Sequence, residues 1–109
     1  MEAAQAVRAL GAIANESRLA VFRLLVSIGP DGLPAGTLAE MLDIAPSALS
    51  FHLKDLTHSG LLVQRPDGRR IIYSASFSTM NALLAYLTEN CCQGQDCGVG
   101  TGMSCSKTA

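Results

Sequence analysis

The chain has 109 residues, of which 49% are hydrophobic and only 5% aromatic, so we expect one small domain with a helical core, to which dimerisation would add stability. Its formal net charge of -1 at pH 7 excludes the strongly basic surface that whole-chain attraction to nucleic acid needs, so any such attraction must be local. No apolar stretch is long enough to span a membrane, and the N-terminus does not resemble a signal peptide.

Apolar residues at helical spacing predict a first helix over residues 3–14, with an inward face formed by Ala3, Ala6, Val7, Leu10, Ile13 and Ala14. Asn15 is a favourable N-cap for a second helix, whose apolar stripe is Val21, Leu24, Leu25 and Ile28. The run from Gly29 to Gly32 ends this helix in a loop.

Pro34 is predicted in the first turn of a third helix, with Leu38, Met41 and Leu42 facing inward. After a short turn, Pro46 opens a fourth helix that buries Leu49, Leu53 and Leu56 and stops at Gly60. Two helices joined in this way predict a helix-turn-helix.

Extended segments at 61–65 and 69–75 flank Pro66-Asp67-Gly68, which predicts a hairpin with its turn at those three residues. Ser76 or Ser78 then caps a fifth helix that ends near Asn90, with an inward stripe of Met80, Leu83, Leu84 and Leu87. The predicted fold class is mainly α with a small β-hairpin, a winged helix-turn-helix in the order α-α-α-α-β-β-α. Residues 1–90 form the predicted DNA-binding and dimerisation domain, and 91–109 a flexible tail rich in Cys and Gly.

The outward side of the fourth helix and the hairpin carry the candidate DNA-binding residues, because short hydroxyls let a helix approach base edges and arginines grip phosphate. Between residues 46 and 73, basic side chains outnumber acidic ones by two. Phe51 either packs inward or contacts a thymine methyl, and of Arg69 and Arg70 only one need reach DNA. His52 is interpreted as a core histidine bonded to backbone. The candidates are Ser47, Ser50, Phe51, Lys54, Arg65, Arg69 and Arg70.

Four runs of the sequence together resemble one family. The first two are Ala14 to Leu19, followed by Leu24-Leu25, and Leu38 to Glu40. The third is Ser47 to Leu62, which contains Ser50, His52, Leu53, Leu56 and Gly60, and the fourth is Arg65 to Tyr73. They are similar to the ArsR family of metalloregulatory repressors over roughly residues 3–89. The resemblance implies a homodimer joined through the first and fifth helices, with the fourth helix in the DNA major groove and the hairpin as wing. It also implies that ligand binding lowers operator affinity.

Two departures from the family pattern remove two of its sensing sites. Residues 40–44 lack the Cys-x-Cys pair that many members carry in the third helix, and residues 81–89 lack the histidine that zinc-binding members use in the fifth. The vicinal pair Cys91-Cys92 instead resembles the arsenic-responsive members, whose thiols follow the last helix.

All four cysteines lie after residue 90, unlike the disulfide framework of a secreted domain, so we expect reduced thiols and a cytoplasmic protein. Cys91, Cys92 and Cys97 are the candidate metal ligands, since fraying at the vicinal pair would let two sulfurs converge and the glycines would let the third fold back. Three thiolates suit trivalent arsenic, with antimony possible. Cys105 is interpreted as a spare thiol.

Three alternatives remain for these thiols: a zinc, cadmium or lead site, a redox sensor, or a glycine-rich tail with incidental cysteines. The CxxC pairs typical of structural zinc are missing. We find no phosphate loop, nucleophile with a base, or carboxylate pair, and therefore exclude the enzyme class. We also expect no obligatory cofactor. The hypothesis is a DNA-binding repressor that leaves its operator when As(III) binds. A metal-scavenging thiol protein is the alternative from another class.

Overall fold

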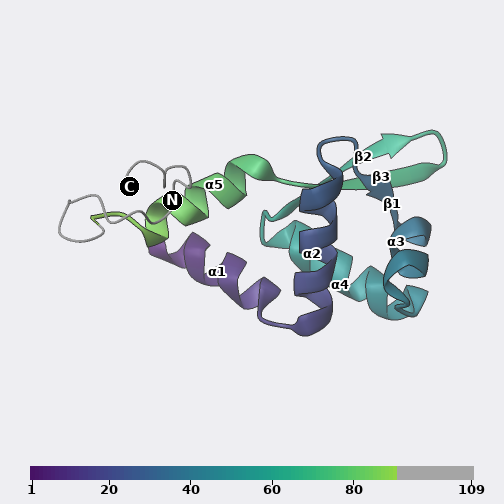
Figure 1. The fold of residues 1–109 in the computed structure, drawn as a ribbon, viewed down its shortest axis with the longest axis horizontal. Coiled ribbons are helices and arrows are strands. Elements are labelled where there is room, and N and C mark those ends of the chain that lie inside the picture. Colours follow the sequence, from purple (N-terminus) through teal and green to yellow (C-terminus); the bar gives the residue numbers. More distant parts are fainter. Residues whose placement is uncertain (91–109) are drawn as a thin grey trace.

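The computed structural model describes residues 1–90, which fold into helices around a small antiparallel sheet (Figure 1). The elements are α1 (Ala3–Ile13), α2 (Glu16–Ile28), β1 (Leu33–Pro34), α3 (Ala35–Leu42), α4 (Pro46–His58), β2 (Leu62–Asp67), β3 (Arg70–Ala75) and α5 (Phe77–Leu87). The predicted winged helix-turn-helix is confirmed, with the short strand β1 added to the predicted order. The predicted tail, with Cys91, Cys92 and Cys97, lies outside the described residues.

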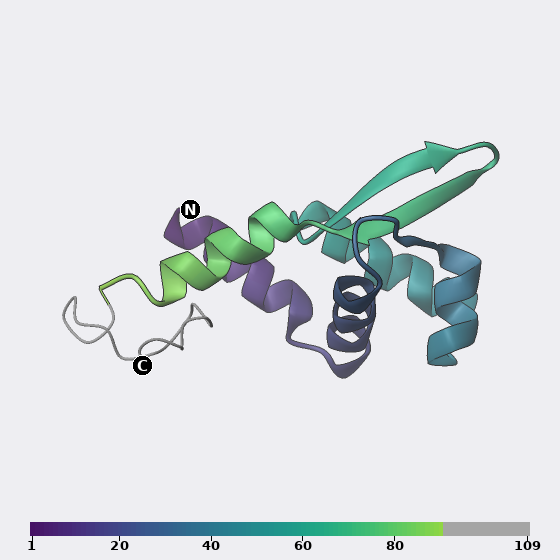
Figure 2. The ribbon, with the colours of Figure 1, turned by 45° about the horizontal axis from the view of Figure 1, so that its top comes forward.

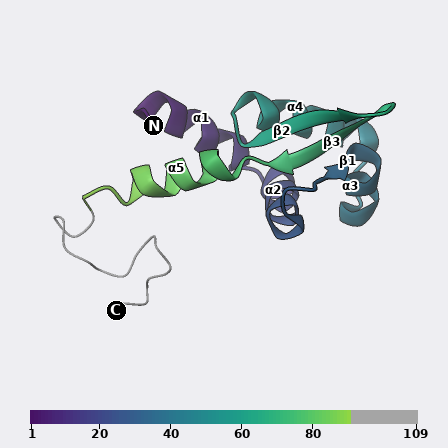
Figure 3. The same cartoon turned by 90° about the horizontal axis from the view of Figure 1, so that it is seen from above.

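The molecule has two parts, an arm made of α1 and α5 and a head made of α2, α3, α4 and the sheet (Figure 1). In the head, the sheet order is β1-β3-β2, and the hairpin of β2 and β3 projects beyond the helices (Figure 2). Seen from above, α5 leaves the sheet directly after β3 and runs back along the arm toward the N-terminus (Figure 3). None of the helices within residues 1–90 has the length and apolarity needed to cross a membrane.

The core of the head is built from leucines of α4. Leu49, Leu53 and Leu56 are at most 1% exposed and pack with Leu25 of α2 and Leu38 of α3, which are fully buried. Each buried leucine contributes about 1.5–3 kcal/mol relative to an exposed one. The predicted stripe on α4 is therefore confirmed, and it determines which side of this helix remains outside.

The predicted inward faces of the arm helices are partly wrong. On α1 the buried residues are Ala6, Ala9 and Ala12, because small side chains allow the helix to lie close to its neighbours. Val7 is instead 68% exposed, and α5 likewise buries Leu83 but leaves Leu84 and Leu87 exposed. The arm consequently presents apolar side chains on its surface. Met41 of α3, also predicted to face inward, is 55% exposed.

The predicted helix starts hold, with one exception. Asn15 Oδ1 accepts a hydrogen bond from the Arg18 N–H at 3.1 Å, and Ser76, rather than Ser78, caps α5 through the Thr79 N–H. Pro46 is the first residue of α4, as predicted. Pro34, however, has the extended backbone of a strand and pairs with Ile72, so α3 begins one residue after it. The pairing with β3 overrides the helical preference of that position.

The predicted hairpin turn is shifted by the structure. Pro66 and Asp67 belong to β2, and the connection is Gly68-Arg69, with Gly68 at φ +66°. Pro66 is tolerated because β2 is an edge strand, where a missing N–H leaves no ladder bond unmade. In this register Arg69 lies at the tip of the hairpin and not, as predicted, in its second strand. At the other boundary, α5 ends at Leu87, before the predicted Asn90.

Candidate nucleic-acid interface

The outer side of α4 carries four of the predicted DNA-binding residues. Ser47, Ser50, Phe51 and Lys54 follow the three-and-four spacing of one helical face, and all four are exposed. They lie outside because the leucine stripe holds the opposite side of α4 in the core. Phe51 is 60% exposed, so the first of its two predicted roles, packing inward, is wrong.

Arg18 ties this helix to α2 through three contacts. Its Nη2 lies 2.6 Å from Asp55 Oδ2, its Nε donates to His52 Nδ1 at 3.0 Å, and its guanidinium carbon lies 5.7 Å from the centre of the Phe51 ring. The Arg18 side chain is only 16% exposed, which reduces solvent screening of these contacts. Arg18 therefore helps to fix the position of α4 relative to α2.

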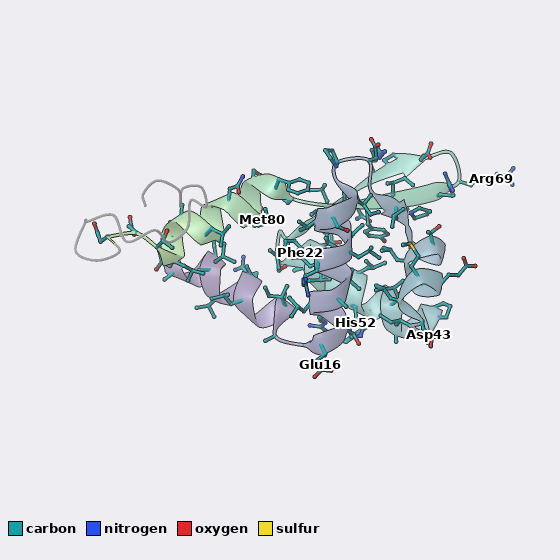
Figure 4. All side chains as sticks on the ribbon, in the orientation of Figure 1. Glu16, Phe22, Asp43, His52, Arg69 and Met80 are labelled. Atoms are coloured by element: carbon teal, nitrogen blue, oxygen red, sulfur yellow. The ribbon has the colours of Figure 1, made fainter. Side chains whose placement is uncertain are left out.

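The partner of His52 is thus a side chain and not the backbone, which corrects the sequence interpretation. Figure 4 shows His52 beside the lower end of α2. Sequence reasoning missed Arg18 as a site residue. The available signal was the i,i+3 pair His52 and Asp55, which places an acceptor and a carboxylate on one partly exposed face, where a cationic partner is favoured.

The three arginines of the hairpin differ in their surroundings. Arg70 pairs with Asp67 across the hairpin at 3.1 Å, and Arg65 donates from Nη2 to the carbonyl oxygen of Asp31 at 3.2 Å. Arg69 has neither an ion pair nor a hydrogen bond within residues 1–90, and Figure 4 shows it pointing away from the tip. Of the three arginines, Arg69 is therefore the one whose charge is available to DNA, whereas Arg65 and Arg70 already have partners.

No metal centre is formed by the residues that the structure describes. Within residues 1–90 there is no group of three or more His, Cys, Asp and Glu side chains placed to hold an ion. The predicted ligands Cys91, Cys92 and Cys97 fall beyond these residues, so their arrangement stays a prediction.

Comparison with known proteins agrees with this architecture. A model described as a helix-turn-helix domain matches residues 13–65. The chain is 34% identical over 90 residues to the transcriptional activator HlyU of Vibrio cholerae, covering 83% of this chain and 81% of that protein. An ArsR-like transcriptional regulator from Rhodococcus has a similar structure, with a TM-score of 0.70 at 28% identity over 80% of this chain and 78% of its own. The chain belongs to the ArsR family of winged helix-turn-helix transcriptional regulators.

Two further likenesses are to a repressor and to a second HlyU structure. A putative arsenical resistance operon repressor of Halobacterium salinarum is 38% identical over 63 residues, which cover 58% of this chain and 48% of that protein. Reduced HlyU from Vibrio cholerae gives a TM-score of 0.59 at 33% identity, over 83% of this chain and 92% of its own. These relatives are regulators of transcription, in agreement with the expectation that the chain is not an enzyme.

Proposed function

We propose that the chain is a homodimeric repressor that binds operator DNA and releases it when arsenite binds Cys91, Cys92 and Cys97. The observation that carries this proposal is the position of the thiols. All four cysteines of the chain come after residue 90, and the vicinal pair follows closely behind α5, which ends at Leu87 in the arm. Because Cys91 and Cys92 follow the arm helix closely in sequence, we infer that a ligand bound to them would act on the arm.

The DNA-binding half of the proposal rests on α4 and the hairpin. Ser47, Ser50, Phe51 and Lys54 form an exposed stripe. Its short hydroxyls suit base edges in a major groove, and its single cation suits a phosphate. Arg69 at the hairpin tip is assigned to the minor groove or a phosphate. Arg65 and Arg70 contribute positive field near the DNA, but their existing partners reduce their value as direct contacts.

Dimerisation through the arm is supported by its apolar surface. Val7 and Leu10 on α1, with Leu84 and Leu87 on α5, are all at least 40% exposed in the single chain. Covering such side chains stabilises an assembly by about 25 cal/mol per Å² of apolar area. A second copy joined at the arm would set the spacing between two α4 helices, as a palindromic operator requires.

The coupling runs through packed elements. The arm helix α5 packs on α1, α1 packs on both α2 and α4, and Arg18 joins α2 to α4. Thiol binding behind α5 would change the dimer seam and with it the relative placement of the two α4 helices. A coupling of 1–3 kcal/mol lowers operator affinity roughly 5–150-fold.

The ligand is assigned by its chemistry. Three thiolates select a soft ion, and trivalent arsenic or antimony bonds three ligands in a pyramid. Zinc, cadmium and lead remain competitors for the same thiols. A thiol redox switch is the second candidate, because the matched HlyU structure is described as reduced and vicinal cysteines are open to oxidation.

The test uses the full chain and a DNA duplex that the protein selects from a random pool. We expect arsenite to release this duplex from the wild-type protein but not from a variant carrying Cys91→Ser and Cys92→Ser. The matched control is Cys105→Ser, which removes a thiol from the same segment and should respond like the wild type. Arsenite release that persists in the double variant would refute the assignment. Release by diamide in the absence of arsenite would favour the redox candidate.

A further inference from the structure

A trough of about 380 Å³ lies between the outer side of α4 and the hairpin. It is lined by Ser50, Lys54, Thr57 and His58 from α4, Gln64 from β2 and Tyr73 from β3. We propose that this trough seats one phosphate group of the bound DNA, held by the charge of Lys54 and by hydrogen bonds from Gln64 and Tyr73.

The lining of the trough suits an anion. Each of its six residues carries a side-chain group that donates hydrogen bonds, and none is a carboxylate. Two of the other hollows beside α3 and α4 differ, since one includes Glu40 and the other Asp55. Lys54 has no ion-pair partner within residues 1–90, so its charge is available to a phosphate.

The pairing of the strands turns two neutral donors toward α4. Gln64 and Tyr73 lie directly opposite each other in the antiparallel ladder, so their side chains share one face of the hairpin. That face continues into the core through the next pair along it, Leu62 and Ala75, which are buried. Because side chains alternate along a strand, Arg65 is directed to the other face of the hairpin. Within residues 1–90, neither the Gln64 amide nor the Tyr73 hydroxyl has a hydrogen-bond partner in the fold.

The geometry of DNA accounts for a phosphate at this position. One sugar-phosphate strand separates the major groove from the neighbouring minor groove. If α4 enters the first and the tip residue Arg69 reaches the second, that strand passes between α4 and the hairpin, which is where the trough lies. This inference rests on the DNA binding of the family and is independent of which effector the thiols recognise.

The variants Tyr73→Phe and Gln64→Met test the inference, because each removes a donor and keeps its size. Binding is measured by fluorescence anisotropy on the selected duplex and on an unrelated duplex of equal length, over a range of salt concentrations. We expect each variant to bind both duplexes about tenfold more weakly, because a phosphate contact carries no sequence information. The salt dependence of binding should not change, since neither substitution removes a charge. Lys54→Met should weaken the binding of both duplexes. It should also lower the slope of log affinity against log salt concentration by about 1.

The control is Ser74→Ala, which removes a hydroxyl from β3 on the face opposite to Tyr73 and should leave both affinities unchanged. Thermal unfolding of each variant confirms that the fold is kept. Wild-type affinity in the combined Tyr73→Phe, Gln64→Met variant would overturn the inference. A loss confined to the selected duplex would also overturn it, because that result indicates contact with bases. Arsenite is absent from all these measurements, so failure of the effector assignment leaves the result intact.

Discussion

Replacing Arg18 by Met tests whether this residue holds α4 in place, because Met keeps the apolar stem and removes the guanidinium. The variant loses the 2.6 Å ion pair with Asp55, whose side chain is 40% exposed, so solvent screening limits this loss to about 1 kcal/mol. The hydrogen bond to His52 contributes about 1 kcal/mol, and the contact with Phe51 about 0.5 kcal/mol. We expect the free energy of unfolding to fall by roughly 2–3 kcal/mol in total.

The assay is urea unfolding at one fixed protein concentration, since dimerisation makes the apparent stability depend on concentration. A double-mutant cycle with Asp55→Asn isolates the pair, with an expected coupling energy of about 1 kcal/mol. The control is Arg23→Met, on an exposed site of α2 with no hydrogen bond or ion pair within residues 1–90, which should change the stability by less than about 0.5 kcal/mol. The reasoning fails if Arg18→Met is no more destabilising than Arg23→Met, or if the coupling energy is near zero.

Three further predictions, which use four substitutions, are each measured by thermal or urea unfolding. Thr57→Val should raise the free energy of unfolding by about 1 kcal/mol, because the buried Thr57 Oγ1 has no partner in the described residues; a loss would show that the hydroxyl is satisfied in solution. Gly32→Ala should cost at least about 2 kcal/mol, because φ is +69° and the new Cβ would lie 2.3 Å from the Tyr73 carbonyl oxygen. Gly68→Asn, at φ +66° with open space, should cost clearly less, and equal costs would contradict this account. Asn15→Ala should lower stability by about 1 kcal/mol through loss of the α2 cap, and an unchanged melting temperature would argue against it.

The sequence alone determined the features that depend on neighbours along the chain. The leucines at positions 49, 53 and 56 repeat with the helical period, so they predicted both the buried side of α4 and the exposed stripe from Ser47 to Lys54. The cap at Asn15 was readable for the same reason, since it acts on an N–H three residues away. The position of the cysteines after the last helix was also a property of the sequence.

Only the tertiary structure decided the features that depend on distant partners. The hairpin register placed Arg69 at the tip and brought Gln64 opposite Tyr73. The alternation of residue types along the two strands did not determine this register. Arg18 meets His52 and Arg65 meets Asp31 across 34 positions of the chain in each case. On α1 the period allowed more than one inward face, and the buried face is the alanine side because close approach to α2 and α4 requires small residues. Periodicity specifies which residues share a face, whereas packing against the rest of the chain selects which face is buried.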